Sequence, residues 1–292
     1  HHSKGPAMTS ITFFDATDRR TAATTRVATR VVTRTRQHDL AAVPAAIRSE
    51  WIKLRSLRSN RAIFGFTIVA GVVMSWVLAT FVKTDPYEHL PFTVANTFMT
   101  ATWLTTVLAV IAGILMYTSE VQHGTIANTI AAQPARWVAV AAKAAVAAGF
   151  GLAMGVVGII AGLASAVASG MDMGDTSGLA VAAAWGLVLT SLAAVLGVGI
   201  GMIIRHSSAA VSTALVWTFV LENLIRSMAP AKLSRFLPFS AANGLLSIRS
   251  AGDTAKTLAA ALTRPQDAVL FAGYTMVALI AGAVLLYRRD AD

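Results

Sequence analysis

Residues 117–137 read YTSEVQHGTIANTIAAQPARW, a polar and amphipathic interruption between two long apolar runs. Its core predicts a short helix over residues 119–133, which ends near Pro134 and is followed by Arg136. Because the apolar runs on either side are long enough to cross a membrane, this stretch is expected to connect two spans at a membrane surface.

The composition is that of an integral membrane protein. Of the 292 residues, 55% are hydrophobic and only 13% are charged, and the mean hydropathy is +0.64. Soluble domains carry roughly 25% charged residues. The sequence contains no cysteine, which excludes a disulfide framework and thiolate chemistry.

Six apolar runs approach or exceed the roughly 18 residues that a helix needs to cross a membrane. The expected spans are residues 62–82, 94–117, 137–169, 178–204, 209–228 and 267–287. The first turns of the third span, with Lys143, are expected to stand in the membrane interface. The fold class expected is therefore all-α and polytopic, with six transmembrane helices in one bundle over residues 62–289.

The long connection before the sixth span is apolar in part but does not read as a span. Its segment LSRFLPFSAANGLLSI is too short to cross and is broken by Pro238 and Gly244. We expect residues 231–250 to form re-entrant or short external helices.

The region before the first span divides into two parts. Residues 1–43 begin with a purification-tag scar, HHSKGPAM, and continue as an Arg-rich segment that predicts a flexible cytoplasmic leader. Residues 44–61 place Ile47, Trp51, Leu54 and Leu57 on one apolar stripe, with basic residues off it. This pattern is typical of an amphipathic helix that lies in the membrane interface.

The basic residues indicate the orientation. Half of the 24 lysines and arginines lie before residue 62. On the same side of a six-span bundle fall Arg136, Lys143, Arg205, Arg288 and Arg289. By the positive-inside rule this side is cytoplasmic, so both termini are expected inside.

The signatures of soluble enzymes are missing from the sequence, which has no GxxxxGK[ST] phosphate loop, no GxSxG elbow and no HExxH. No catalytic residue is therefore assigned, and any ATP must bind to another chain. Glu120 and His123 share one helical face, but a metal site would need further ligands, and none is predicted. The charge distribution suggests membrane lipids as partners and gives no indication of nucleic acid.

Two charged residues lie in the fifth span, where charge is expensive. Glu222 and Arg226 are four apart, the favourable order for a helical ion pair, and Asn223 lies beside them. Such residues normally face a bundle interior or a polar cavity. They are candidates for a substrate path or a gate; a structural pair, or an arginine reaching the outer headgroups, is the other interpretation.

Within residues 117–137, the order of a glutamate, a glycine–threonine pair, a proline and an arginine resembles the E..xGT...P..R pattern after the second span of type-two ABC transporter permeases. The residues that carry this resemblance are Glu120, Gly124, Thr125, Pro134 and Arg136. The helix AIRSEWIKLRSLRS is similar to the interfacial, or elbow, helix of the same family, with Trp51, Lys53, Arg55 and Arg58. Together with the six spans, the resemblance covers residues 44–289.

The resemblance implies the membrane subunit of a bacterial ABC exporter that moves a drug, peptide or lipid outward by alternating access. It implies two ABC ATPase subunits, which bind ATP and Mg²⁺, and a second permease copy in a homodimer or a heterodimer. Residues 119–133 would be the coupling helix. The docking residues that it implies are Glu120, His123, Gly124, Thr125, Ile126, Pro134 and Arg136.

An ion- or proton-coupled secondary transporter that uses Glu222 is the alternative. This class predicts internal repeats with interrupted spans in matching places. The sequence shows no convincing repeat, so the exporter permease is the preferred hypothesis.

Overall fold

The computed structural model describes residues 42–55, 58–81, 93–125, 135–172, 176, 178–248 and 262–289. All regular structure in these ranges is helical, and six of the helices are long and apolar enough to cross a membrane. They are α2 (Arg58–Phe81), α3 (Val94–Gln122), α5 (Arg136–Ala168), α6 (Leu179–Ile204), the composite α7–η1–α8 (Ser207–Met228) and α12 (Arg264–Arg289). The expected fold class is confirmed.

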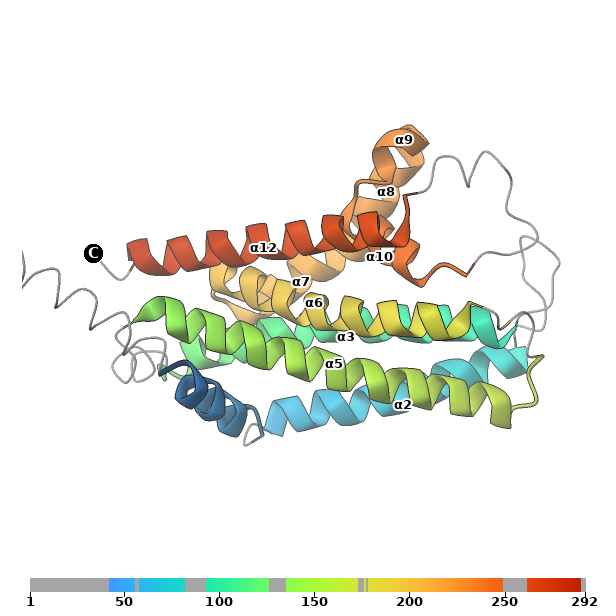
Figure 1. Ribbon diagram of the computed structural model, residues 1–292, viewed down its shortest axis with the longest axis horizontal. Coiled ribbons are helices and arrows are strands. Elements are labelled where there is room, and N and C mark those ends of the chain that lie inside the picture. Colours follow the sequence, from blue (N-terminus) through green and yellow to red (C-terminus); the bar gives the residue numbers. More distant parts are fainter. Residues whose placement is uncertain are drawn as a thin grey trace, which may run out of the picture.

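The helices α2, α3, α5, α6 and α12 run side by side along the length of the molecule, whereas α7, η1 and α8 rise obliquely out of this bundle (Figure 1). The helix at residues 42–55 and the end of α12 lie at one end, which we call the basic end. Toward the opposite, far end lie the short helices α9 (Ala231–Ser234) and α10 (Pro238–Leu246). About three fifths of the apolar window of α3 and of α6 is buried, 61% in each, against 22% in α12. α3 and α6 are therefore the central helices.

Small residues bring the central backbones together. Gly113 of α3 lies against the carbonyl of Ala194, and Gly197 of α6 lies against the carbonyl of Val110, so that a Cβ at either glycine would collide with backbone. Close approach of this kind holds helices together where lipid offers no hydrophobic drive for association. These two glycines therefore serve helix packing.

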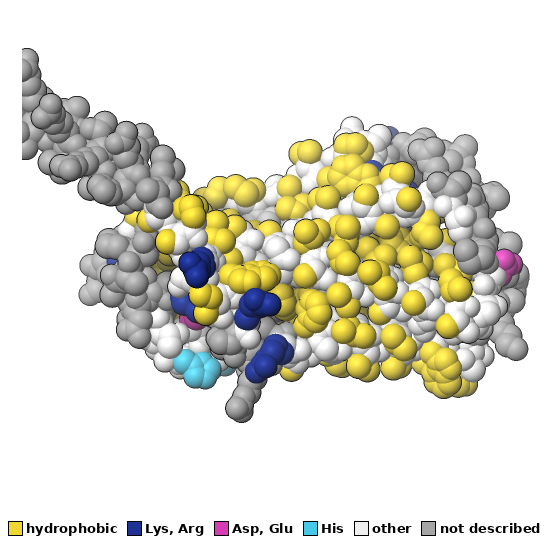
Figure 2. All heavy atoms as spheres, turned by 60° about the horizontal axis from the view of Figure 1, so that its bottom comes forward, with side chains coloured by type: hydrophobic (Ala, Val, Ile, Leu, Met, Phe, Trp, Pro, Cys, Tyr) yellow, Lys and Arg dark blue, Asp and Glu magenta, His cyan; other side chains and the backbone are white. Residues whose placement is uncertain are grey.

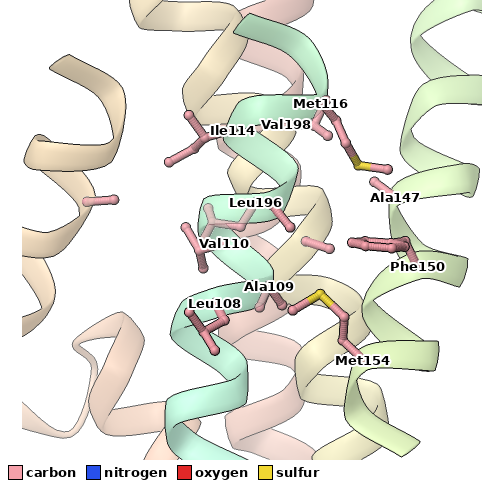
Figure 3. Packing of buried hydrophobic residues seen from close by; sticks show 14 of the residues in the cluster. Leu108, Ala109, Val110, Ile114, Met116, Ala147, Phe150, Met154, Leu196 and Val198 are labelled. Carbon is pink, nitrogen blue, oxygen red and sulfur yellow. The ribbon is translucent and has the colours of Figure 1, made fainter. Parts of the chain in front are cut away.

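Apolar side chains fill the space around this contact. In Figure 3, Phe150 and Met154 of α5 point toward α3, whereas Val110 of α3 points to the opposite side. Phe150 and Met154 are at most 5% exposed. The core is thus continuous from α5 through α3 to α6.

The surface of the spans is also apolar. Phe66 and Trp76 of α2 are more than half exposed, as is Val277 of α12. Figure 2 shows apolar side chains over most of one face, with the lysines and arginines gathered toward the basic end. An apolar surface between two ends that carry the charged residues is suited to a bilayer.

The elements differ from the sequence expectation in two places. Residues 119–122, expected to begin a separate helix over 119–133, continue α3, because the i to i−4 hydrogen bonding runs on to Gln122. Residues 126–134 lie outside the described residues, as does the leader through residue 41. The expected fifth span contains a π-helical turn, Trp217–Leu221, between α7 (Ser207–Val216) and α8 (Glu222–Met228).

Candidate functional site

The end of α3 has a defined stop at the basic end. Gly124 adopts φ +67°, the left-handed conformation that glycine enters without a Cβ penalty. Its amide donates to Val121 O at 3.2 Å, and the Thr125 amide donates to Glu120 O at 3.0 Å. These two bonds form a Schellman turn. The Gly-Thr pair therefore ends the helix and fixes the direction in which the chain leaves it.

Four charged side chains meet beside this turn, and we call them the charged cluster: Glu50, Lys53, Glu120 and Lys143. Lys143 Nζ lies 2.6 Å from Glu50 Oε2 and 2.8 Å from Glu120 Oε1. Lys53 Nζ lies 2.5 Å from Glu50 Oε1 and 3.8 Å from Glu120 Oε1. The cluster thus joins the helix at residues 42–55, the end of α3 and the start of α5.

The cluster is largely withdrawn from solvent. Glu50, Glu120 and Lys143 are each at most 8% exposed. Burial alone would raise the pKa of Glu50, but the charge and hydrogen bond of Lys143, aided by Lys53, outweigh burial and hold that pKa below its ordinary value of 4.5. Glu120 Oε2 is buried and has no hydrogen-bond partner within the described part of the chain. One acceptor position of the cluster is therefore unfilled by these residues.

Lys143 was expected only to stand in the membrane interface with the first turns of the third span. The structure adds that its side chain is buried between two carboxylates. Sequence reasoning also missed Glu50, although it is the single acidic residue in the basic segment 44–61. An isolated acid three residues before Lys53 is a signal that could have identified it.

The other residues assigned to docking are spread around this end. His123 is exposed, and its Nδ1 lies 2.7 Å from Ser119 O. Arg136 begins α5, donates to Leu286 O of α12 at 3.4 Å, and lies over the ring of Tyr287. Ile126 and Pro134 lie outside the described residues.

The helix at residues 42–55 has two faces. Leu54 is 7% exposed and joins the hydrophobic core. Trp51 is 39% exposed, and the guanidinium of Arg55 lies 5.9 Å from the centre of its ring. Arg58 is the first residue of α2. Lys53 turns toward the charged cluster, so one face is tied to the bundle while Trp51 remains free for the interface.

Glu222 lies in a different environment, nearer the far end. Its side chain is fully buried, directly after the π-helical turn. Glu222 Oε2 accepts the Phe239 amide at 3.0 Å, and Oε1 accepts the Ser240 amide at 2.5 Å and the Ser240 hydroxyl at 3.2 Å. These amides are unpaired donors at the start of α10, and a carboxylate there is stabilised by the helix dipole. Glu222 therefore anchors α10 to the fifth candidate span.

The neighbours of Glu222 are more exposed. Arg226 Nη2 lies 3.5 Å from Glu222 Oε1 and donates to Ser240 Oγ at 3.0 Å. Asn223 Nδ2 donates to Phe219 O within its own helix at 2.9 Å. The side chains of Glu222 and Arg226, both in α8, thus contact the start of α10 together. The Asn223 amide instead bonds to the backbone of its own helix.

Metal ligation has no obvious place in the described ranges. They contain no group of three or more histidine, cysteine, aspartate or glutamate side chains that could hold a metal ion. The charged cluster contains two lysines among its four members, and ammonium groups are donors that repel a cation. Its geometry suits a mechanical connection between helices.

One family matches the sequence. A model described as ABC-2 family transporter protein matches residues 46–224, more than half of the chain. The matched range starts within the helix at residues 42–55 and ends in α8, so it includes the charged cluster and Glu222. A search of curated proteins found no match.

Proposed function

We propose a role for this chain from one premise: the chain belongs to the ABC-2 family of transporter membrane proteins. It is therefore a membrane permease, a transport subunit without a catalytic domain. Beyond this, we propose that it is an exporter subunit for a hydrophobic or amphipathic compound, a drug, a peptide or a lipid. The apolar core between its spans and the few charges within them support that substrate class.

The observation that carries the proposal is the charged cluster. The buried Lys143 of α5 bonds to two buried carboxylates, Glu50, which is 93 residues away in the sequence, and Glu120, which is 23 residues away. It thereby joins the helix at residues 42–55, the end of α3 and the start of α5 at one point. Breaking such a buried pair by removing one partner costs about 3–5 kcal/mol, so these elements should move together. A force applied to the α3–α5 connection would then reach the helix at residues 42–55, α3 and α5 at once.

We propose that two ABC ATPase subunits dock at this end, on the α3–α5 connection, and bind ATP and Mg²⁺ themselves. The proposed docking residues are those that the family resemblance implies: Glu120, His123, Gly124, Thr125, Ile126, Pro134 and Arg136. The Schellman turn at Gly124 supports this role because it aims the connection away from α3 in a fixed direction. Closure of the ATPases can drive the permease only through differential binding to its two states.

The proposed orientation follows from the charges. The basic end would be cytoplasmic, with both termini inside, and α9 and α10 would lie toward the outer surface. Two permease copies would enclose the transport path between them. The fifth candidate span supports this arrangement, since it leaves Phe219, Leu224 and Met228 exposed at its far half for a partner or lipid.

Glu222 is proposed as the anchor of a gate rather than a proton carrier. Both of its oxygens accept backbone amides of α10, and Pro238 and Phe239 line the same cavity as Trp217 and Val277 of spanning helices. This supports a re-entrant α10 whose start reaches membrane depth. A proton-coupled secondary carrier would need a carboxylate that exchanges partners, whereas this one is committed to a helix start.

Copurification tests the docking proposal. The chain is expressed together with ABC ATPases of the same cell, and the permease is purified by affinity in mild detergent. We expect an ATPase to copurify and its hydrolysis to depend on the permease, with Gly124→Pro abolishing the dependence. Asn223→Ala, remote from the basic end, is the matched control and should leave it intact. Failure of any ATPase to copurify with a folded permease would refute the proposal.

A further inference from the structure

An apolar cavity of about 460 Å³ lies between α6, the fifth candidate span and α12. Val110 and Leu196 form its floor, and Trp217, Phe239 and Val277 stand around it. Its volume falls within the roughly 300–1,000 Å³ of small-molecule sites. The hydroxyl of Tyr274, on its wall, donates to Phe236 O at 2.8 Å and is therefore occupied. A ligand in this cavity would therefore be held mainly by contacts with apolar side chains.

The cavity opens at the side of the bundle. α12 packs on α6 and α10 and has little contact with α7, so a gap remains between the fifth and sixth candidate spans. Trp217 and Val277, one from each side of this gap, are 37% and 68% exposed. Because both belong to candidate spans, the opening faces the hydrocarbon of the bilayer.

The depth of the cavity corresponds to one leaflet. Its residues on α6 run from Leu196 to Ile204, the last residue of that helix at the basic end. Eight residues of α helix rise about 12 Å. A single leaflet contributes about 15 Å of a hydrocarbon core about 30 Å thick. One acyl chain that enters from headgroup level at the basic end would therefore run along most of the cavity.

A cation stands at that headgroup level. Arg205 directly follows Ile203 and Ile204 of the cavity wall. Its φ of 60° makes it the sole non-glycine residue of the described ranges in the left-handed region, a helix-ending position that glycine or asparagine normally takes. Its side chain has no hydrogen bond or ion pair with the described residues. Glycine would fit this backbone conformation better, so an arginine at this position indicates that its positive charge has a role.

We propose that this cavity holds one acyl chain of an anionic phospholipid from the leaflet at the basic end, with the lipid phosphate paired to Arg205. Guanidinium binds phosphate through parallel hydrogen bonds, which a zwitterionic headgroup only partly matches because its own cation competes. The site is independent of the transport proposal, since it needs only the cavity, the bilayer and Arg205.

Photocrosslinking tests the site on the full-length chain in vesicles. Two lipids with the same diazirine-bearing acyl chain, a phosphatidylglycerol and a phosphatidylcholine, are compared at equal mole fraction, and crosslinked peptides are mapped by mass spectrometry. We expect phosphatidylglycerol to label α6, η1 and α12 around the cavity about fivefold more than phosphatidylcholine does. Equal labelling by the two lipids in the unmodified chain would overturn the proposal.

Variants distinguish recognition of the lipid headgroup from binding of its acyl chain. Arg205→Gly suits the left-handed backbone and should reduce phosphatidylglycerol labelling to the phosphatidylcholine level, while Arg205→Lys keeps the charge without the parallel hydrogen bonds and should retain only part of the excess. Ala281→Trp and Thr213→Trp, on opposite walls, should block labelling by both lipids. Val156→Trp on the exposed face of α5 is the control and should leave labelling unchanged. Cavity peptides left unlabelled by phosphatidylglycerol in the unmodified chain, or an excess that survives Arg205→Gly, would refute the site.

Discussion

The charged cluster and Glu222 both bury glutamates in an apolar bundle, but they neutralise them differently. In the cluster, Lys143 supplies the opposing charge from a long side chain and joins three elements. At Glu222, the main partners are two backbone amides at the start of α10, and the cation Arg226 remains 3.5 Å away and partly exposed. Side-chain pairs depend on protonation and on each partner, whereas backbone amides persist as long as the helix does. The charged cluster should therefore be more sensitive than the Glu222 site to pH and to the substitution of a single side chain.

Lys143→Met should give the largest effect. It removes the buried cation between Glu50 and Glu120 and leaves them only the partly exposed Lys53, so we expect a loss of about 3–5 kcal/mol in unfolding free energy. The apparent unfolding midpoint in detergent measures it. Lys53→Met is the matched control, because the Lys53 side chain is 36% exposed, and it should lower the midpoint far less. Equal effects of the two substitutions would contradict a cluster centred on Lys143.

Glu222→Ala should have the next largest effect. It leaves the Phe239 and Ser240 amides without their acceptor, at about 1–3 kcal/mol, and frees α10 from the fifth candidate span. Glu222→Gln keeps one acceptor oxygen, so we expect it to fold and express but to transport poorly. Protease cleavage between residues 229 and 240 reports release of α10. Normal transport by a folded Glu222→Gln protein would remove Glu222 from the gate.

Gly124→Ala should act more weakly. A Cβ at φ +67° costs about 1 kcal/mol and disturbs the Schellman turn, whereas Gly124→Asn tolerates this conformation better. Stimulation of a copurified ATPase is the readout that matters here. We expect Gly124→Ala to reduce it more than Gly124→Asn does; the opposite order would show that the turn conformation is not what the glycine provides.

Acidification should give the smallest effect near neutrality. The folded pKa of Glu50 is lowered, so its contribution to stability is fully present above its unfolded pKa of about 4.5 and is lost as the pH falls through the lower folded value. The contribution of Glu50 to the unfolding midpoint should therefore change little between pH 7 and about pH 5. Below that range, Glu50→Gln should be less sensitive to acid than the unmodified chain, and equal sensitivity would contradict the role of Glu50.

Much of this fold was readable from the sequence, because a membrane imposes a length and a polarity on every span. The six apolar runs predicted six helices, and Pro238 does stand at the start of a short helix, α10. Gly244 was expected to break this segment, but it lies within α10, because a single glycine weakens a helix without ending it. The continuation of α3 to Gln122 was missed, since polar residues at a membrane surface extend a helix without a change of periodicity. The π-helical turn before Glu222 has no sequence signal of its own.

The site was less readable than the fold. Glu120, Gly124 and Lys143 were each visible in the sequence, but their meeting with Glu50 depends on contacts across 93 residues. A single sequence indicates that a charge is unusual without indicating its partner. For Glu222, the sequence suggested Arg226 by helical spacing, and the closer backbone partners on α10 became apparent only in the fold.

The most direct test of a rigid basic end is a distance measurement within the permease–ATPase complex. The chain has no cysteine, so spin labels can be placed at Arg48→Cys and Ala141→Cys, both exposed, on the helix at residues 42–55 and on α5. We predict one narrow distance distribution that is the same without nucleotide and with ATP and vanadate, and that broadens when Lys143→Met is added. A distance that shifts between the two nucleotide states in the otherwise unmodified chain would contradict the claim that the charged cluster makes these helices move as one body.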